Sequence, residues 1–280
     1  MEVENKHRGW QRVLLLIVPY IFTVGFFQSL GALISGVNIT DCELEQTSIQ
    51  QLIISSFDFL GTFFVLWLFM KFIDKEQFIK LGFYIKGRFK DFAIGIVIGL
   101  LIMSIGYFLL LYLNEITFQK INFNTKETLI TILLFTIVAI VEETLLRGYI
   151  LRNLMISFNK YSALIISSIL FSLMHGFNPN IDLFALTNLF LAGILLGLSY
   201  IHTKNLWFPI ALHLSWNLFQ SLLGFNVSGL DTYSIIEFNI SEKSLLNGGA
   251  FGFEGSIFSV IAMLITTALI EVYYRKKYEA

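Results

Sequence analysis

The chain has 280 residues, of which 56% are hydrophobic and 14% are charged, and its mean hydropathy is +0.73. Soluble domains carry about 25% charged residues, so this composition excludes a soluble protein and indicates a polytopic membrane protein. A net charge of -1, without any Lys/Arg-rich block, excludes nucleic acid as an expected partner. Cys42 is the single cysteine, which excludes an intrachain disulfide and a cysteine-ligated zinc site.

Eight apolar segments are candidate membrane-spanning helices, because such a helix needs roughly 20 mostly apolar residues. The first is too long for the apolar region of a signal peptide and is expected to be retained. The fifth is short, and residues 150–158 could lengthen it. The predicted fold class is therefore all-α, with about eight transmembrane helices. In chain order the segments cover about residues 13–34, 52–72, 92–113, 129–146, 162–174, 183–201, 206–223 and 257–273.

The positive charges are distributed unequally between the two sides of these segments. Of the 19 Lys and Arg residues, only Lys120, Lys126 and Lys243 fall on one side when the loops are assigned alternately. Cytoplasmic loops are enriched in Lys and Arg, so both termini are expected in the cytoplasm. The expected location is the plasma membrane of a bacterium. No linker or tandem repeat divides the chain, which predicts a single transmembrane domain over residues 1–280.

Several glycines suggest close helix packing. Gly95-x-x-x-Gly99 and Gly193-x-x-x-Gly197 place small residues one helical turn apart, as in many helix contacts within membranes. Glu254 stands in a glycine-rich polar stretch before the last segment. We expect Glu254 to be a solvated charge at the outer end of that helix.

Two adjacent acids, Glu142 and Glu143, precede Arg147 in the fourth segment. Ionisable groups inside a bilayer cost several kcal/mol unless they pair or face water, so they are candidates for a functional site. Glu143 and Arg147 are four residues apart and share a helix face, whereas Glu142 points about 100° away. We expect one acid to be neutralised locally while the other faces a cavity. Arg147 is then a structural partner, or else an ordinary cytoplasmic-loop charge.

Two further segments repeat this four-residue spacing. Phe171 and His175 lie on one face of the fifth segment, and His213 and Asn217 lie on one face of the seventh. A single intramembrane histidine is usually a hydrogen-bonded packing residue. Two histidines, each within such a pair, favour a shared site in the helix core at about residues 129–223.

These side chains are suited to hydrolysis by two routes. A carboxyl group in an apolar cavity exchanges protons readily, so Glu142 is the candidate base for water and then the acid for the leaving amine. In one route, His175 and His213 bind a divalent metal, with zinc expected, and Glu142 or Glu143 is a further ligand or the base. In the other, His175 shares the base role without metal, while His213 and Asn217 donate hydrogen bonds to the oxyanion. The residues alone leave both routes open.

The three motifs, Glu142-Glu143-x-x-x-Arg147, Phe171-x-x-x-His175 and His213-x-x-x-Asn217, resemble those of the CPBP intramembrane proteases. That family includes type II CAAX prenyl endopeptidases, bacteriocin-processing and immunity-associated proteins, and abortive-infection proteins. The resemblance implies peptide-bond hydrolysis within the membrane, with Glu142, Glu143, His175, His213 and Asn217 at the centre and Arg147 as their structural partner. It also implies a hydrophobic or prenylated peptide substrate, and either a metal or a glutamate that activates water.

Two other classes of function stay open. Paired acids in membrane helices are also typical of proton- or ion-coupled transporters, although the matching halves of many transporters are not found in this sequence. A non-catalytic immunity protein that binds a peptide in the same cavity would carry the same residues. The sequence does not indicate an oligomeric state.

Overall fold

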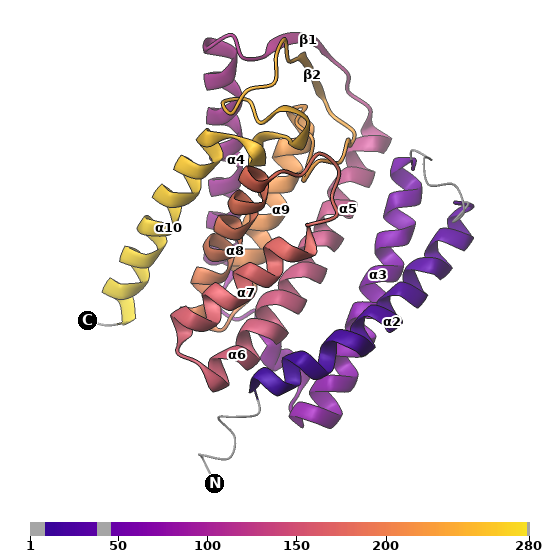
Figure 1. Cartoon of the computed structure of the whole chain (residues 1–280), viewed down its shortest axis with the longest axis vertical. Helices are drawn as coiled ribbons and strands as arrows, with labels where there is room; N and C mark the ends of the chain where they lie inside the picture. Colours follow the sequence, from indigo (N-terminus) through magenta and orange to yellow (C-terminus); the bar gives the residue numbers. More distant parts are fainter. Residues whose placement is uncertain (1–8, 38–45, 279–280) are drawn as a thin grey trace.

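The computed structural model describes residues 9–37 and 46–278 as a bundle of helices with one small sheet at one end (Figure 1). Cys42 and the basic segment at residues 1–8 lie outside the described residues. Among the described residues, six helical spans are long and apolar enough to cross a membrane. The predicted fold class, an all-α integral membrane protein, is confirmed. The six spans are Gly9–Ser35, Ser48–Asp74, Phe89–Tyr112, Thr125–Ser157, Leu183–Thr203 and Ile257–Lys277.

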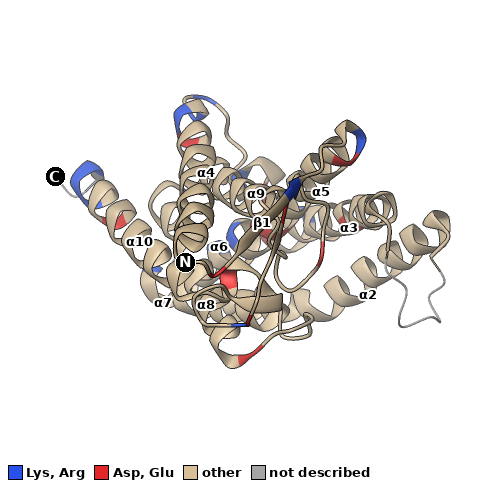
Figure 2. Cartoon of the chain, turned by 90° about the horizontal axis from the view of Figure 1, so that it is seen from above, with Lys and Arg blue, Asp and Glu red and all other residues tan. Residues whose placement is uncertain are grey.

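Most of the charged residues lie near the ends of the helices and in the connections between them (Figure 2). The sides of most helices carry none, as a lipid-facing surface requires. Helix α2 begins and helix α10 ends toward the end of the bundle opposite the sheet (Figure 1). This arrangement agrees with an even number of crossings.

Helices α2 (Gly9–Ser35) and α3 (Ser48–Leu68) form an antiparallel hairpin on one side of the bundle (Figure 1). Thr47 begins α3 with a capping box, in which its side chain accepts from the Gln50 backbone and the Gln50 side chain accepts from the Thr47 backbone. Helix α3 continues into a π-helical turn, η1 (Phe69–Asp74). The second helix of the hairpin is thus extended to Asp74.

A short 3₁₀ turn, η2 (Phe78–Leu81), leads to α4 (Phe89–Tyr112), which packs along α9 (Trp207–Leu222). A Cβ atom added at Gly95 would lie 2.8 Å from the Cβ of Ala211, so a larger residue would push the helices apart. The packing role predicted for this glycine pair is confirmed.

The second glycine pair brings α8 (Leu183–Thr203) against α7 (Lys160–Met174). A Cβ atom at Gly193 would lie 2.8 Å from the Cα of Ser168. The predicted packing role is confirmed here too. Asn159 and Asp182 cap the N-termini of these two helices through their side chains.

The fourth predicted segment is longer than expected. Helix α5 (Thr125–Glu143) runs into a π-helical segment, η3 (Thr144–Leu151), and then into α6 (Arg152–Ser157). Residues 147–157 were expected in a loop or as an extension of the fifth helix, and that expectation is wrong. The helix continues because its polar side chains find partners: Asp74 Oδ2 accepts from the hydroxyl of Tyr149 at 2.9 Å, and Glu76 pairs with Arg152.

The two shorter helices are central to the bundle. Helix α7 has 15 residues and α9 has 16 residues, too few to span a bilayer unaided. Helix α9 packs against α4, α5 and α8, and most of its side chains are buried. Because neighbouring helices cover it, α9 does not need the length of a lipid-exposed span.

A two-stranded antiparallel sheet joins two connections at one end of the bundle. Strand β1 (Thr117–Ile121) follows α4 and pairs with β2 (Ile236–Asn239), which follows α9. Two 3₁₀ turns, η4 (Gly249–Phe251) and η5 (Phe253–Gly255), then lead into α10 (Ile257–Tyr278). The segment between β2 and α10 therefore folds back over the end of the bundle that carries α8 and α9.

Candidate active site

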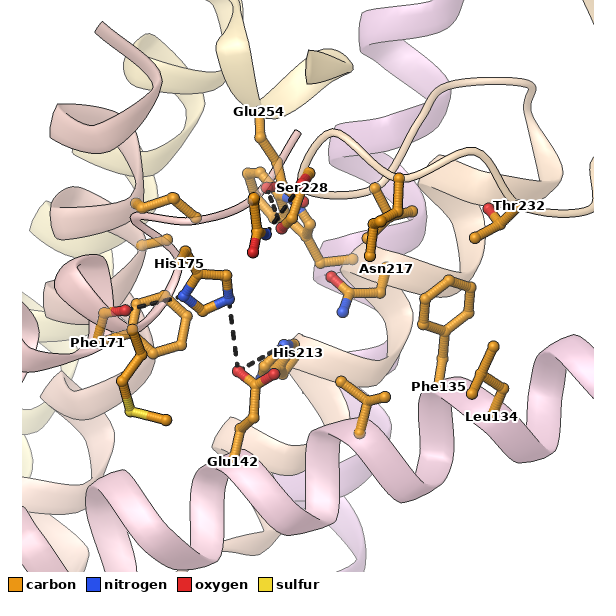
Figure 3. Close-up of a pocket in the computed structure, with 18 of the residues that line it drawn as sticks. Leu134, Phe135, Glu142, Phe171, His175, His213, Asn217, Ser228, Thr232 and Glu254 are labelled. Atoms are coloured by element: carbon orange, nitrogen blue, oxygen red, sulfur yellow. Dashed lines mark hydrogen bonds and ion pairs between the residues drawn. The ribbon is translucent and has the colours of Figure 1, made fainter. Parts of the chain in front are cut away.

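A cavity of about 880 Å³ opens between the helices and contains the predicted site residues. Its walls come from α3, α5, α7, α8 and α9 and from residues 227–232 and Glu254. Much of the wall is apolar, with Leu134, Phe135 and Leu189 among the lining residues. Glu142, His175, His213 and Asn217 all line this cavity, so residues from three helices meet in one place (Figure 3).

The two adjacent acids at the end of α5 have different surroundings. The Glu142 side chain lines the cavity and is 23% exposed, whereas the Glu143 side chain is fully buried behind it. Successive helical residues point about 100° apart, which explains the separation. The π-helical segment η3 begins directly after Glu143, and such segments are frequent at functional sites. The predicted division between a neutralised acid and a cavity-facing acid is found in the structure.

Glu143 is neutralised by Arg147. The Arg147 Nη1 atom lies 2.8 Å from Glu143 Oε1, and Nη2 donates to the carbonyl of Gly193 at 3.2 Å. The guanidinium also lies 4.6 Å from the centre of the Phe171 ring, a cation–π distance. Arg147 is therefore a buried residue of the helix core, and its alternative assignment as a cytoplasmic-loop charge is wrong.

The ring orientation of His175 follows from one hydrogen bond. Its Nδ1 atom lies 2.8 Å from the carbonyl oxygen of Phe171, which can only accept. Nδ1 therefore carries the proton, and in the neutral ring Nε2 has a free lone pair. Nε2 faces Glu142, at 3.8 Å from Oε2 (Figure 3). His175 caps the C-terminus of α7. The last carbonyl groups of a helix have no partner within the helix, so the Phe171 carbonyl is free to accept from the His175 ring.

The ring of His213 is also oriented by a hydrogen bond at Nδ1, here to a carboxylate. Its Nδ1 atom lies 2.8 Å from Glu143 Oε1, the oxygen that also accepts from Arg147. An ionised carboxylate only accepts, so Nδ1 donates and Nε2 faces the cavity. Nε2 lies 4.0 Å from Glu142 Oε2. Glu143 thus fixes the imidazole that stands beside Glu142.

Asn217 lies one turn after His213 and also lines the cavity. Its side-chain amide forms no hydrogen bond with any described residue, although the side chain is mostly buried. Such an amide is available to donate to a ligand. His213 and Asn217 were predicted to donate hydrogen bonds to an oxyanion. A neutral His213 has a single N–H, which it donates to Glu143, so Asn217 is the member of the pair that can donate without carrying a charge.

Glu254 is a cavity residue that sequence reasoning missed. It was expected to be solvated, yet it is only 8% exposed and lies across the cavity from Glu142 (Figure 3). Ser228 donates to its Oε2 at 2.9 Å. The sequence signal was the glycine run: Gly252 has φ +99°, and a Cβ there would overlap the carbonyl of Asn226. Only a glycine permits this close turn, which brings Glu254 inward.

Three side chains, Glu142, His175 and His213, were expected to hold a metal. Glu142, His175 and His213 supply the right donor types, a carboxylate and two free Nε2 atoms whose rings are fixed through Nδ1. Ligand atoms about 2.1 Å from a tetrahedral zinc lie about 3.4 Å apart. The separations here are 3.8 and 4.0 Å, and the described residues contain no metal-binding group of three or more His, Cys, Asp or Glu side chains. As placed, these residues do not fit one zinc ion.

Comparison with known proteins identifies the segment that carries this site. Residues 124–219 match the family model described as type II CAAX prenyl endopeptidase, Rce1-like. The searches of curated proteins and of solved structures found no match. The matched segment runs from the N-cap of α5 into α9 and contains all three motifs. The resemblance to type II CAAX prenyl endopeptidases seen in the sequence is thereby confirmed: residues 124–219 are similar to the Rce1-like family model.

Proposed function

We propose that the protein is an intramembrane endopeptidase that hydrolyses peptide bonds of hydrophobic, membrane-associated or lipidated peptides. One observation carries the proposal: the Glu142 carboxylate faces Nε2 of both His175 and His213 inside a cavity formed by membrane helices. A carboxylate and two imidazoles in this arrangement can take up and return the protons of a water molecule. The family match supports the reaction class.

Glu142 is the proposed general base. The distance of 3.8 Å between its carboxylate and Nε2 of His175 is too long for a direct hydrogen bond. A water molecule placed between the two groups would hydrogen-bond to both. Glu142 takes one proton as the water oxygen attacks the carbonyl carbon. Glu143 and Arg147 contribute indirectly, because they fix the ring of His213 beside Glu142.

Asn217 is the proposed oxyanion donor. Its amide N–H groups are not used by any described residue and lie on the cavity side of α9, one turn from His213. Donors placed before the reaction stabilise the charge that develops on the carbonyl oxygen. An imidazolium at His213, balanced by Glu143, would supply a second donor from Nε2.

A divalent metal, such as the zinc ion suggested by the sequence, is the alternative proposal for water activation. It would be held by Glu142, His175 and His213, and the carboxylate would have to turn toward the two rings to bind one ion. When bound, such an ion would act as a Lewis acid and make bound water more acidic. The steps above use only side chains of the chain itself.

Hydrophobic substrates suit the cavity walls. Ile54 of α3 and Phe135 and Val138 of α5 line it beside the polar centre. Apolar side chains of a peptide would lose contact with water here, at a gain of about 25 cal/mol per Å² of apolar surface. The expected partners are therefore a hydrophobic or prenylated peptide and the lipid bilayer.

The test is direct cleavage. The protein is purified in detergent and incubated with hydrophobic and prenylated peptides, and the products are identified by mass spectrometry. Glu142→Gln serves as the inactive variant, and Glu237→Gln, a partly exposed carboxylate on β2 outside the cavity, serves as the matched control. Cleavage that is equal in wild type and Glu142→Gln would contradict the proposed role of Glu142. No cleavage of any peptide would contradict the proposed function.

A further inference from the structure

Hydrogen bonds fix the backbone of Glu254 in the cavity wall. Asn188 of α8 donates through Nδ2 to the Glu254 carbonyl at 2.7 Å, and Ser259 donates to the same carbonyl through its hydroxyl at 3.0 Å. Gly252, two residues earlier, adopts a conformation that an L side chain rarely allows. The backbone of Glu254 is therefore fixed on both sides, and its side chain reaches the cavity.

The Glu254 side chain is held by the loop at residues 227–232, which lines the cavity. Ser228 donates to Glu254 Oε2 at 2.9 Å, and the Ser228 carbonyl accepts from Asn178 Nδ2 at 3.0 Å. Asn178 lies three residues beyond His175. The position of the Glu254 carboxyl group is thus linked to the segment that carries one of the two cavity histidines.

Within the described part of the chain, the Glu254 carboxyl group is not paired with a Lys or Arg side chain. None of the described residues that line the cavity is Lys or Arg, and no described Lys or Arg forms a salt bridge with Glu254. A buried carboxylate without a cation is costly, so the protonated form is favoured. Burial raises the pKa of Glu254, although the hydrogen bond from Ser228 and the nearby His175 and His213 act in the opposite direction. Glu142, in contrast, is partly exposed, and its Oε2 atom lies 3.8 Å from Nε2 of His175 and 4.0 Å from Nε2 of His213.

Hydrolysis of an amide needs both a base and an acid. Two carboxyl groups whose surroundings differ in this way commonly divide the two tasks. Glu142 and Glu254 face the same cavity from opposite walls, so a peptide bound between them would have one carboxyl on each side (Figure 3). We propose that Glu254 is the general acid that protonates the leaving amine while Glu142 is the base, an inference that rests on the proposed endopeptidase function.

The protons balance over one cycle. Glu142 takes a proton from water, and the hydroxide oxygen forms a bond to the carbonyl carbon. Glu254 gives its proton to the amide nitrogen as the C–N bond breaks, which yields an amine and a carboxylic acid. The proton on Glu142 then passes through water to Glu254, and both groups return to their starting states.

The test compares two leaving groups on the same acyl peptide. An amine is a poor leaving group and needs protonation, whereas an ester oxygen leaves without much help. In Glu254→Gln, which keeps the shape and can still accept from Ser228, kcat for the amide is expected to fall by about 10²-fold or more. Ester hydrolysis is expected to stay within a few fold of wild type. Glu142→Gln should lose both activities, and Glu237→Gln should keep both.

The outcomes separate the two proposals. Amide hydrolysis retained in Glu254→Gln overturns the role of Glu254 alone. An equal loss on amide and ester also overturns it, because that pattern indicates damage to the fold or to binding. If Glu254→Gln fails to fold, Glu254→Asp, which keeps an acid on a shorter chain, is compared with the same two substrates. Wild-type protein that cleaves neither substrate overturns the endopeptidase function and the role of Glu254 together.

Discussion

The Glu142 carboxylate and the imidazole of His175 face each other across 3.8 Å, from the C-terminal ends of two different helices. A hydrogen bond to the Phe171 carbonyl fixes which nitrogen of the ring points at the carboxylate. This pair is the proposed site of water activation.

Glu142→Gln removes the proposed base without changing the size of the side chain. We expect peptide cleavage to fall by 10²-fold or more while the protein still inserts and elutes as a folded species. Product formation under single-turnover conditions measures the chemical step. Cleavage within a few fold of wild type would remove Glu142 from the role of base.

His175 and His213 are expected to respond differently to replacement. His175→Ala removes a partner of the attacking water, so activity should fall with little change in stability. His213→Ala also leaves the buried Glu143 carboxylate without one of its hydrogen bonds. Loss of a buried partner costs about 1–3 kcal/mol, so His213→Ala should unfold at a lower temperature than His175→Ala. Equal thermal midpoints for the two variants would contradict this link.

The Glu143–Arg147 pair is expected to be a stability element. Both side chains are almost completely buried, so Arg147→Met leaves the buried Glu143 carboxylate without its cation, at a cost of about 3–5 kcal/mol. The double variant Glu143→Leu/Arg147→Met should recover part of that loss, because it leaves neither charge buried. Thermal unfolding in detergent measures each step of this double-mutant cycle. A double variant less stable than Arg147→Met would contradict the expectation.

Metal content decides between the two proposals for water activation. Since the three donors lie wider apart than one zinc ion requires, we expect full turnover at much less than one metal per chain. Elemental analysis of active protein, before and after chelation, gives the ratio. Activity that chelators abolish and Zn²⁺ restores would instead establish the metal proposal.

Topology follows from the unequal distribution of Lys and Arg. Reporter fusions after Tyr112 and after Gly249 should report the outer side of the membrane, and fusions after Lys90 and at the C-terminus should report the cytoplasm. The sheet that joins β1 and β2 then lies outside. A cytoplasmic signal at Gly249 would contradict the proposed orientation.

The sequence by itself determined the class of the protein and the main parts of its site. Within a bilayer, apolar segments must satisfy their backbone hydrogen bonds internally as helices, so most of the helices could be located from composition alone. The continuation of the fourth segment to Ser157 could not. The four-residue spacing of Glu143 and Arg147, and of His213 and Asn217, placed each pair on one helix face. The separation of Glu142 from Glu143 followed from the same periodicity.

Only the tertiary structure decided what lies opposite these faces. Arg147 is buried because Glu143, Gly193 and Phe171 surround it, and two of these come from other helices. Glu254 faces the cavity because a glycine turn and Asn188 hold its backbone there. Local sequence patterns report the periodicity of one element. The partners that neutralise or orient a charge are brought by the packing of distant segments, which no local pattern records.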